Sequence, residues 1–438
     1  MLDKLEEEFP THVPRTPGMP HPLEGLRVVD FSHFIAGPLA TMILADMGAE
    51  VIKVEAPGRG DDLRRYPPVH PQLDQGAPFL WSNRNKKSVA LDLKSPEGIA
   101  LAKELIARSD VLVENFSSGV MDRLGLGYKA CRDLNPRLVY CSIAAYSRDG
   151  AFADRLGFDP IAQAESGFVS MNGYADRDGV RALSPVMDIS TAMMVGNAVM
   201  GALLARGRTG QGQRVEVSLF DTAVFMTGYA SMQSLFTGKD PQRNGNTSPD
   251  TCPSGAFHAK DRTFYINSGN DNIFQRLMIQ VLERPDVAAD PDYASPSLRT
   301  RHRDKLFAIL EDAFAREEWA HWQQRMRAAG VPCGLVRTVS EAIRSPEARD
   351  HALVTRIPHP TLGWVPNVRL PIRFADTPIA DPVTAPAVGQ HTREVLQQVL
   401  ALDASRLDEL ALQGVFGLDA ATVASTSLVK PSIASAQT

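Results

Sequence analysis

The chain has 438 residues, of which 44% are hydrophobic and 22% are charged, and its formal net charge is −5. A chain of this length exceeds one ordinary hydrophobic core, so we expect a large globular α/β protein with two domains. The net negative charge gives no electrostatic reason to expect nucleic acid as a partner.

The cysteines and the N-terminus indicate a cytoplasmic protein. The four cysteines lie far apart, with no C-x-x-C pair and no His/Cys run at metal-ligand spacing, so we expect no metal site. The first twenty residues are acidic and proline-rich and lack an apolar core, which argues against a secretory signal.

The longest apolar stretch runs from Ala192 to Ala205. It is interrupted by Gly196, Asn197 and Gly201 and is shorter than the ~20 residues that a membrane-spanning helix needs. We therefore interpret it as a buried helix and expect no membrane anchor.

The first predicted elements follow an N-terminal tail over residues 1–21, which we expect to be disordered. The segment that comes next, GLRVVDFSHFIAGPLATMILADMGAEVIKVE, is typical of a strand, a loop, a helix and a second strand. Pro38 suits the start of the helix because it gives up an amide that has no partner there, and Gly48 suits its end. The segment is therefore predicted to be a βαβ unit.

A second unit follows along the chain. A helix is predicted from Ser95 to about Ser109, then a short strand at 111–116 that is buried on both faces, and another parallel strand at 138–146. Strands that alternate with helices predict a doubly wound parallel sheet, whose ligands usually bind beyond the carboxyl ends of the strands.

The second half of the chain has a different pattern of predicted elements. The pattern is helical over 158–206 and returns to a strand within 207–219, after which we expect an antiparallel hairpin that turns at 260–262. A smaller α+β domain would be completed by a helix from about Asn272, amphipathic helices at 298–316 and 318–329, and a strand at 332–336. We place the large domain at 22–225, completed by 380–420, the smaller domain at 245–350, linkers at 226–244 and 351–379, and a disordered tail at 421–438.

The first strand-to-helix loop, 31–38, occupies the position at which a Rossmann protein binds pyrophosphate. It lacks G-x-G-x-x-G, so a nicotinamide cofactor is disfavoured. Its backbone amides, at a helix N-terminus, suit a phosphate. His33, taken alone, fits a packed loop histidine better than a ligand-binding residue.

A cationic run lies in the segment NRNKKSVALDLK and contains Arg84, Lys86, Lys87 and Lys94. A solvated face is the usual explanation of such a run. A ligand with several phosphates would need a cluster of this kind, and Arg123 suits a bidentate phosphate contact.

Asp188 stands at the start of a predicted helix, after Pro185. By residue type alone it is more readily explained as a helix cap than as a catalytic group. A carboxylate at this position is also kept ionised by the helix amides and can act as a nucleophile. Asp159 is a second carboxylate of the same ambiguous kind. The chain contains no G-x-S-x-G and no H-E-x-x-H, so hydrolase and zinc-enzyme interpretations lose support.

Taken together, several motifs in one order resemble the class III CoA-transferase family, also called CaiB/BaiF. The resemblance covers about residues 22 to 400 and is greatest to members that act on dicarboxylic acids such as succinate and glutarate. The motifs are LEGLRVVDFSHFIAGPLATMILADMGAEVIKVE, NRNKKSVALDLKSPEG, VENFSSGVMDRLGLGY, GFDPIAQAESG, MDISTAMMVGNAVMGALLARGRTGQGQRVEVSL and GQHTREVL.

The resemblance implies a fold and an activity. The fold would be a Rossmann-like large domain built from both chain ends, with a smaller domain between them, in an interlocked homodimer. The activity would move CoA from an acyl-CoA to a free carboxylic acid through a covalent intermediate on Asp188. Coenzyme A and acyl-CoA would be substrates, with no permanently bound cofactor. The implied CoA contacts are His33, Phe34, Ile35, Ala36, Leu91, Lys94, Asn115, Phe116, Arg123 and Leu124.

The chain departs from the family pattern in three places. The segment that corresponds to a glycine-rich flap, 268–272, has one glycine. Ala56 replaces the cation often found after the second strand, and residues 145–147 read Ala-Tyr-Ser where the family usually has G-Y-G.

Two rival functions remain. In α-methylacyl-CoA racemases of the same fold, a histidine precedes the aspartate that corresponds to Asp159; here the residue is Phe158, which cannot move a proton. A CoA- or nucleotide-binding protein without catalysis would be favoured if Asp188 only capped its helix. For a dicarboxylate substrate, Arg243 is a candidate partner of the distal carboxylate, although a surface arginine explains it equally well.

Overall fold

The computed structural model describes residues 8–14, 18–73 and 75–416. The chain divides into two compact units. Unit 1 comprises Met1–Phe168, Ala182–Ser231 and Arg349–Thr438, and unit 2 comprises Val169–Arg181 and Met232–Ala348.

Unit 1 contains a six-stranded sheet in which every neighbouring pair is parallel. This confirms the predicted parallel sheet. The strand order is β3-β2-β1-β4-β5-β6, so the direction of winding reverses between β1 and β4, where ligands of such sheets usually bind. The strands are β1 (Arg27–Asp30), β2 (Glu50–Glu55), β3 (Lys86–Ala90), β4 (Val111–Glu114), β5 (Val139–Ala144) and β6 (Arg214–Ser218).

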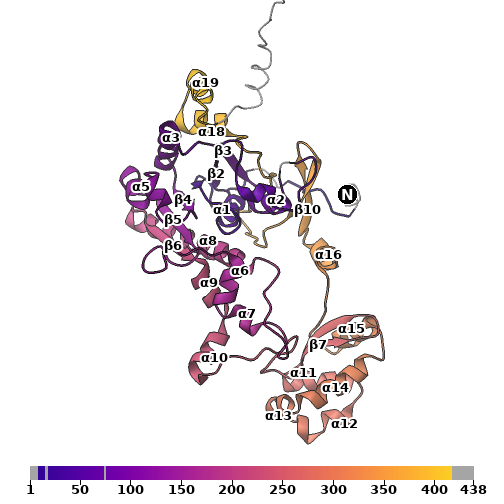
Figure 1. Ribbon diagram of the computed structural model, residues 1–438. Helices are drawn as coiled ribbons and strands as arrows, with labels where there is room; N and C mark the ends of the chain where they lie inside the picture. The colour runs from indigo at the N-terminus through magenta and orange to yellow at the C-terminus, as the bar shows by residue number, and fades with distance from the viewer. Residues whose placement is uncertain (1–7, 15–17, 74, 417–438) are drawn as a thin grey trace, which may run out of the picture. The chain divides into compact units, whose positions relative to one another are not determined.

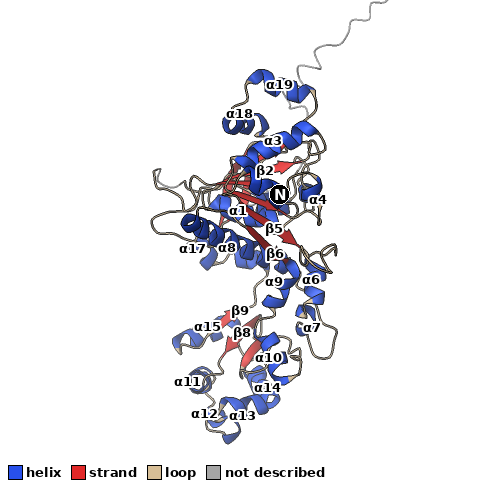
Figure 2. Cartoon of the chain, turned by 90° about the vertical axis from the view of Figure 1, so that its left-hand side faces the viewer, coloured by secondary structure: helices blue, strands red, loops and turns tan. Residues whose placement is uncertain are grey.

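Helices cover both faces of the sheet (Figure 2). Successive residues of a strand point to opposite faces, so Val28 packs in one core cluster and Val29 in the other. One face packs against α1 (Ala36–Asp46), α8 (Val186–Thr209) and α9 (Leu219–Met226). The other packs against α3 (Pro96–Ala107), α5 (Tyr128–Leu134), α18 (Thr392–Leu400) and α19 (Ala404–Leu412).

The apolar stretch predicted as a buried helix lies inside α8. Ala192, Val195 and Val199 are fully buried in the core cluster, whereas Met193 and Leu204 are exposed. Within the described ranges, α8 is the one helix long and apolar enough to cross a membrane by length and composition. Its buried face is that of a core helix, and its opposite face is uncovered in the single chain.

Two predicted irregular regions are ordered. Residues 351–379 are not a plain linker, because β10 (Val354–His359) and β11 (Gly363–Val368) form an antiparallel hairpin within them. The expectation of a disordered tail over 1–21 is wrong at Phe9, which is buried, and at His12, whose amide donates to the carbonyl of Arg356 at 2.8 Å. The expected tail at 421–438 lies outside the described residues.

Unit 2 has a three-stranded antiparallel sheet in the order β7-β8-β9, and helices gather around it (Figure 1). The predicted hairpin is confirmed as β7 (Ser254–His258) and β8 (Thr263–Asn267), with β9 at Cys333–Leu335. Aromatic side chains fill its core: Phe257, Phe264, Phe274, Phe314, Trp319 and Trp322. The helical segments between 271 and 328 are α11 (Asp271–Arg276), η3 (Leu277–Val281), α12 (Pro285–Ala288), η4 (Pro291–Tyr293), α13 (Pro296–Arg301), α14 (Arg303–Phe314) and α15 (Trp319–Ala328).

The packing of β4 generates a stability prediction. Leu112→Ala removes a side chain that is 0% exposed, so it should lower the free energy of unfolding by about 2–5 kcal/mol. Leu412→Ala, at a position that is 81% exposed, is the control and should change it by no more than about 0.5 kcal/mol. Urea denaturation followed by circular dichroism measures both; equal effects would contradict the assigned core.

Candidate active site

The carboxyl ends of β1 and β4 carry the first group of predicted site residues. The backbone amide of His33 donates to Asn115 Oδ1 at 2.8 Å, and Asn115 Nδ2 donates to the carbonyl of His33 at 2.8 Å. The His33 ring also meets the Phe116 ring edge-on, with centroids 5.0 Å apart. The two loops that flank the reversal point are therefore tied together.

Buried charges lie directly beneath this loop. Lys53 Nζ donates to the carbonyl of Ser32 at 2.7 Å and forms an ion pair with Asp61 Oδ2 at 3.0 Å. Asp30 accepts from the amide of Ser32 at 2.9 Å and pairs with Lys86 Nζ at 3.0 Å. All of these side chains are buried. The loop backbone is therefore held from below by fixed charges.

Burial and neighbouring charges oppose each other in setting the pKa values of Asp30, Lys86 and the nearby Glu55. Burial raises the pKa of Asp30, but Lys86 and Lys53 outweigh this effect and hold that pKa well below its usual range. Burial lowers the pKa of Lys86 to about 8, against the attraction of Asp30. Burial raises the pKa of Glu55, yet its hydrogen bonds and ion pair with Arg64 hold that pKa at about 2. Compensation of this kind is what permits charges inside a core.

Phe34 occupies a strained backbone conformation at the tip of the loop. Its φ of 62° lies in the left-handed region, which bulky side chains rarely adopt. Asp61 Oδ1 accepts its amide at 3.2 Å, and its ring contacts Phe158 with centroids 6.0 Å apart. The following Ile35 is the N-cap of α1 and makes no side-chain capping bond, so the amides at the start of α1 have no side-chain cap.

Structural ion pairs occupy three of the four cations in this run, and the usual explanation of a solvated face is wrong for Arg84 and Lys86, which are buried. Arg84 pairs with Asp46, Lys86 with Asp30, and Lys87 with Glu50 and Glu394. Each of these cations neutralises a carboxylate on a segment that is distant in sequence. Of the four cations in this run, only Lys94 remains available to bind a ligand.

Two predicted cations near the carboxyl ends of the strands remain available to bind a ligand. Lys94, which follows β3, and Arg123, the last residue of α4 (Val120–Arg123), are exposed. Neither side chain has a hydrogen bond or ion pair within the described ranges. Leu91 is buried and Leu124 packs against the same core cluster, so both support the edge from inside.

Asp188 is the third residue of α8 and does not cap it. The N-cap is Pro185, which makes no side-chain capping bond. Asp159 supplies the cap instead, because its Oδ2 accepts the amide of Met187 at 2.7 Å and that of Asp188 at 3.3 Å. The interpretation of Asp188 as a helix cap is therefore wrong, and its carboxylate makes no hydrogen bond within the described residues.

The environment of Asp188 alters its ionisation. Burial, and secondly the negative charge of Asp159, raise the pKa of Asp188 to about 7. A carboxylate with such a pKa is more basic than a solvated one and is half ionised near neutral pH. This is a property of reactive carboxyl groups. The expectation that the helix amides keep this carboxylate ionised is therefore wrong.

The two parts of the site are connected through Phe158. This side chain is 62% exposed, contacts Phe34 in the first loop, and directly precedes Asp159. The loop at β1 and the start of α8 are therefore linked by consecutive contacts within unit 1.

The segment that corresponds to the family's flap, 268–272, is anchored in unit 2. Ser268 is fully buried, and the buried Arg299 donates through Nη2 to the carbonyl of Gly269 and to Asp271 Oδ1, both at 2.7 Å. A Cβ at Gly269 would lie 2.1 Å from Thr251 Cγ2. The glycine is therefore explained by close packing.

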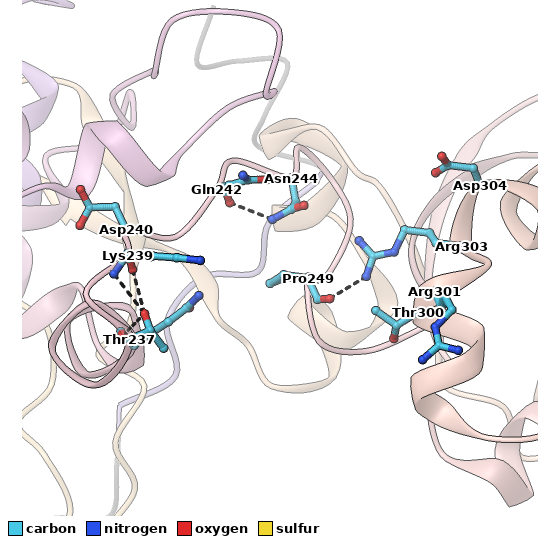
Figure 3. A pocket seen from close by; sticks show the side chains of 11 residues that line it. Thr237, Lys239, Asp240, Gln242, Asn244, Pro249, Thr300, Arg301, Arg303 and Asp304 are labelled. Atoms are coloured by element: carbon cyan, nitrogen blue, oxygen red, sulfur yellow. Dashed lines mark hydrogen bonds between the residues drawn. The ribbon is translucent and has the colours of Figure 1, made fainter.

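The side chain of Arg243 is engaged in hydrogen bonds to backbone carbonyl groups. Its guanidinium donates to the carbonyls of Ser170, Tyr174 and Arg177, so a role in holding this loop accounts for it. A separate open pocket of about 680 Å³ lies nearby in unit 2 (Figure 3). Its lining mixes Lys239, Arg301 and Arg303 with Asp240 and Asp304, and it contains no predicted site residue.

Sequence reasoning missed Lys53 and Asp61, although a signal was present. Lys53 interrupts the apolar strand VIKVE at a position that the sheet buries. A buried lysine requires a buried carboxylate partner, which could have been sought among the acidic residues that follow the strand. Within the described ranges, no group of three or more His, Cys, Asp or Glu could hold a metal ion.

The raised pKa of Asp188 predicts a pH-dependent stability. The folded-state pKa of about 7 exceeds the ordinary value of 3.8 for an aspartic acid, so the folded chain holds this proton more tightly and loses stability from this group as pH rises from about 4 to 7. Asp188→Asn removes the penalty and should stabilise the chain by about 1–4 kcal/mol at pH 8. The gain should shrink towards zero near pH 4. Thermal midpoints of both proteins across this range test it; a gain independent of pH would contradict the assignment.

Comparison with known proteins identifies the family. A model described as CoA-transferase family III matches residues 23–392. The chain is 35% identical over 394 residues to a succinyl-CoA:glutarate CoA-transferase of Mus musculus, which covers 90% of each chain. It is 39% identical over 337 residues to an acetyl-CoA:oxalate CoA-transferase of Acetobacter aceti, covering 76% of this chain and 85% of that protein.

Comparison with a solved structure identifies the same family. A CaiB/BaiF family protein from Brucella suis has a TM-score of 0.78 and 32% sequence identity, covering 87% of this chain and 100% of that one. The resemblance deduced from the motifs is confirmed. The chain belongs to CoA-transferase family III, the CaiB/BaiF family of acyl-CoA:carboxylate CoA-transferases.

Proposed function

We propose that this enzyme moves CoA from a succinyl-CoA-like donor to a free dicarboxylic acid through a covalent intermediate on Asp188. The observation that carries the proposal is a partly buried carboxylate, free of hydrogen bonds within the described residues, with its pKa raised to about 7. Such a group is a competent nucleophile toward a thioester. The names of the relatives, which include glutarate and oxalate transferases, support a dicarboxylate acceptor.

The reaction conserves the thioester. Asp188 attacks the donor carbonyl carbon, the C–S bond breaks, and CoA leaves as a thiolate while a mixed anhydride forms. The thiolate attacks the aspartyl carbonyl of this anhydride, which releases the donor acid and leaves an aspartyl-CoA thioester. The acceptor carboxylate attacks that thioester, the C–S bond breaks, and CoA leaves again as a thiolate while a second anhydride forms. The thiolate then attacks the acceptor's acyl carbon and frees Asp188.

Binding of CoA is assigned to the carboxyl edge of the sheet. The amides of the loop His33–Ala36 suit a phosphate, and Lys94 and Arg123 are the available cations. Asn115 and Phe116 fix the opposite side of the loop. The side chains of Leu91 and Leu124 support this edge from the core.

We also propose a cytoplasmic homodimer in which two chains of a large and a small domain interlock. Apolar side chains on α8 and the helix that follows support this: Met193, Leu204 and Phe225 are 54%, 73% and 71% exposed. Exposed apolar surface of this kind is typical of a protein interface. A second copy of the chain would bury it.

A covalent test targets Asp188. After incubation with succinyl-CoA, hydroxylamine or borohydride should produce a mass change on the peptide that contains Asp188, because both reagents trap an activated acyl group. Asp188→Asn should lower turnover by at least about 10³-fold and leave CoA binding nearly intact. Asp133→Asn, an exposed residue of α5 on the opposite face of the sheet, is the control. Retained turnover in Asp188→Asn would overturn the proposal.

A substrate panel tests the acceptor class. Succinyl-CoA and other donor esters are paired with glutarate, succinate, oxalate and monocarboxylic acids, and the products are separated by chromatography. We expect dicarboxylates to be preferred by at least about tenfold in kcat/KM, since a second charge adds a specific contact. Preference for monocarboxylates would contradict this. Exchange of the α-proton with deuterated water, without an acceptor acid, would instead support racemisation.

A further inference from the structure

Asp159 is a buried carboxylate, 4% exposed, whose two oxygens are both occupied. It is the first residue of α6 (Asp159–Glu165). Oδ2 accepts from the amides of Met187 and Asp188, and Oδ1 accepts from Gln163 Nε2 at 2.6 Å. Gln163 is oriented in turn, because its Oε1 accepts the amide of Ala182 at 2.8 Å. The carboxylate of Asp159 is therefore held in one position.

The start of α8 leaves Asp188 with no capping role. A carboxylate at the third helical position normally reaches back to the amide of the N-cap residue. Here the N-cap is Pro185, which has no amide hydrogen. The amides further into the first turn are taken by Asp159. Both features free the side chain of Asp188 from its own helix.

Asp159 also places a negative charge beside Asp188. Within the described residues, it is the only ionisable group whose charge shifts the pKa of Asp188. Other ionisable groups on α8 and on the elements packed against it make no such contribution. They are Arg206 and Arg208 on α8, Asp46 on α1, Glu165 on α6, Asp221 on α9, Tyr140 and Cys141 on β5, and Arg214 and Glu216 on β6.

We propose that Asp159 is a positioning residue for Asp188: from α6 it caps the first turn of α8 and holds a fixed negative charge next to the nucleophile. The inference rests on the proposed function of Asp188. The charge matters because Asp188 is an anion before it reacts and is neutral once acylated. Repulsion by Asp159 therefore disfavours the free carboxylate relative to the anhydride or thioester, and favours acylation.

Two variants separate charge from hydrogen bonding. In Asp159→Asn, the new amide oxygen can still accept from α8, but the new NH₂ group would face the NH₂ group of Gln163. Adding Gln163→Glu provides an acceptor at that point and leaves Oε1 for the amide of Ala182. The double variant thus restores the hydrogen bonds and the net charge, with the charge one side chain further from α8.

The first readout needs no turnover. Carbodiimide modifies protonated carboxyl groups, and peptide mass spectrometry gives the pH of half-modification at Asp188. We expect a midpoint near 7 in the wild type, at least one pH unit lower in Asp159→Asn, and an intermediate value in the double variant. Asp221→Asn, which alters an exposed charge on α9, should leave the midpoint unchanged.

The second readout is the pH profile of transfer. In Asp159→Asn the acid limb of kcat/KM should move to lower pH with the midpoint, and kcat at pH 8 should fall at least tenfold while KM for the acyl-CoA stays within about twofold. Unchanged midpoints in both variants would overturn the inference and show a structural cap alone. Failure of the proposed function is distinct: Asp188→Asn would then retain transfer, whatever the midpoints.

Discussion

The ion pair between Lys53 and Asp61 is the interaction on which the site depends. Both side chains are fully buried, and each also holds the first loop: Lys53 binds the carbonyl of Ser32, and Asp61 binds the amide of Phe34. Removing one partner of a buried pair leaves an uncompensated charge, which is far more costly than replacing both. The strained loop at Phe34 is therefore ordered before any ligand arrives, so that binding spends little free energy on ordering it.

The ordered first loop is also connected to Asp188, the proposed nucleophile. Phe34 contacts Phe158, and the next residue, Asp159, caps the helix that carries Asp188. The loop suited to phosphate and the carboxylate of Asp188 are thus fixed relative to each other by a chain of contacts within unit 1. A thioester joins a long polar cofactor to a small acyl group, so an enzyme acting on it must fix the distance between the two binding regions.

The sequence predicts the features that depend on local pattern. Strands buried on both faces, such as β4, are legible as short apolar runs, and the family motifs locate Asp188 and the loop at His33. Features that depend on partners distant in the sequence cannot be predicted from it. Arg84 and Lys87 resemble a ligand-binding cluster until the fold brings Asp46 and Glu394 against them, and the capping of α8 by Asp159 joins residues that belong to different helices.

The surroundings of Asp188 favour acyl transfer over proton transfer. Racemisation at an α-carbon requires a base and an acid on opposite sides of that carbon, and the side chain before Asp159 is the apolar Phe158, in contact with Phe34. This apolar pair supplies no proton, although the Phe158 side chain is itself 62% exposed. In the proposed mechanism an aspartyl anhydride would hydrolyse readily, so exclusion of water would decide whether the acyl group reaches the acceptor or is lost.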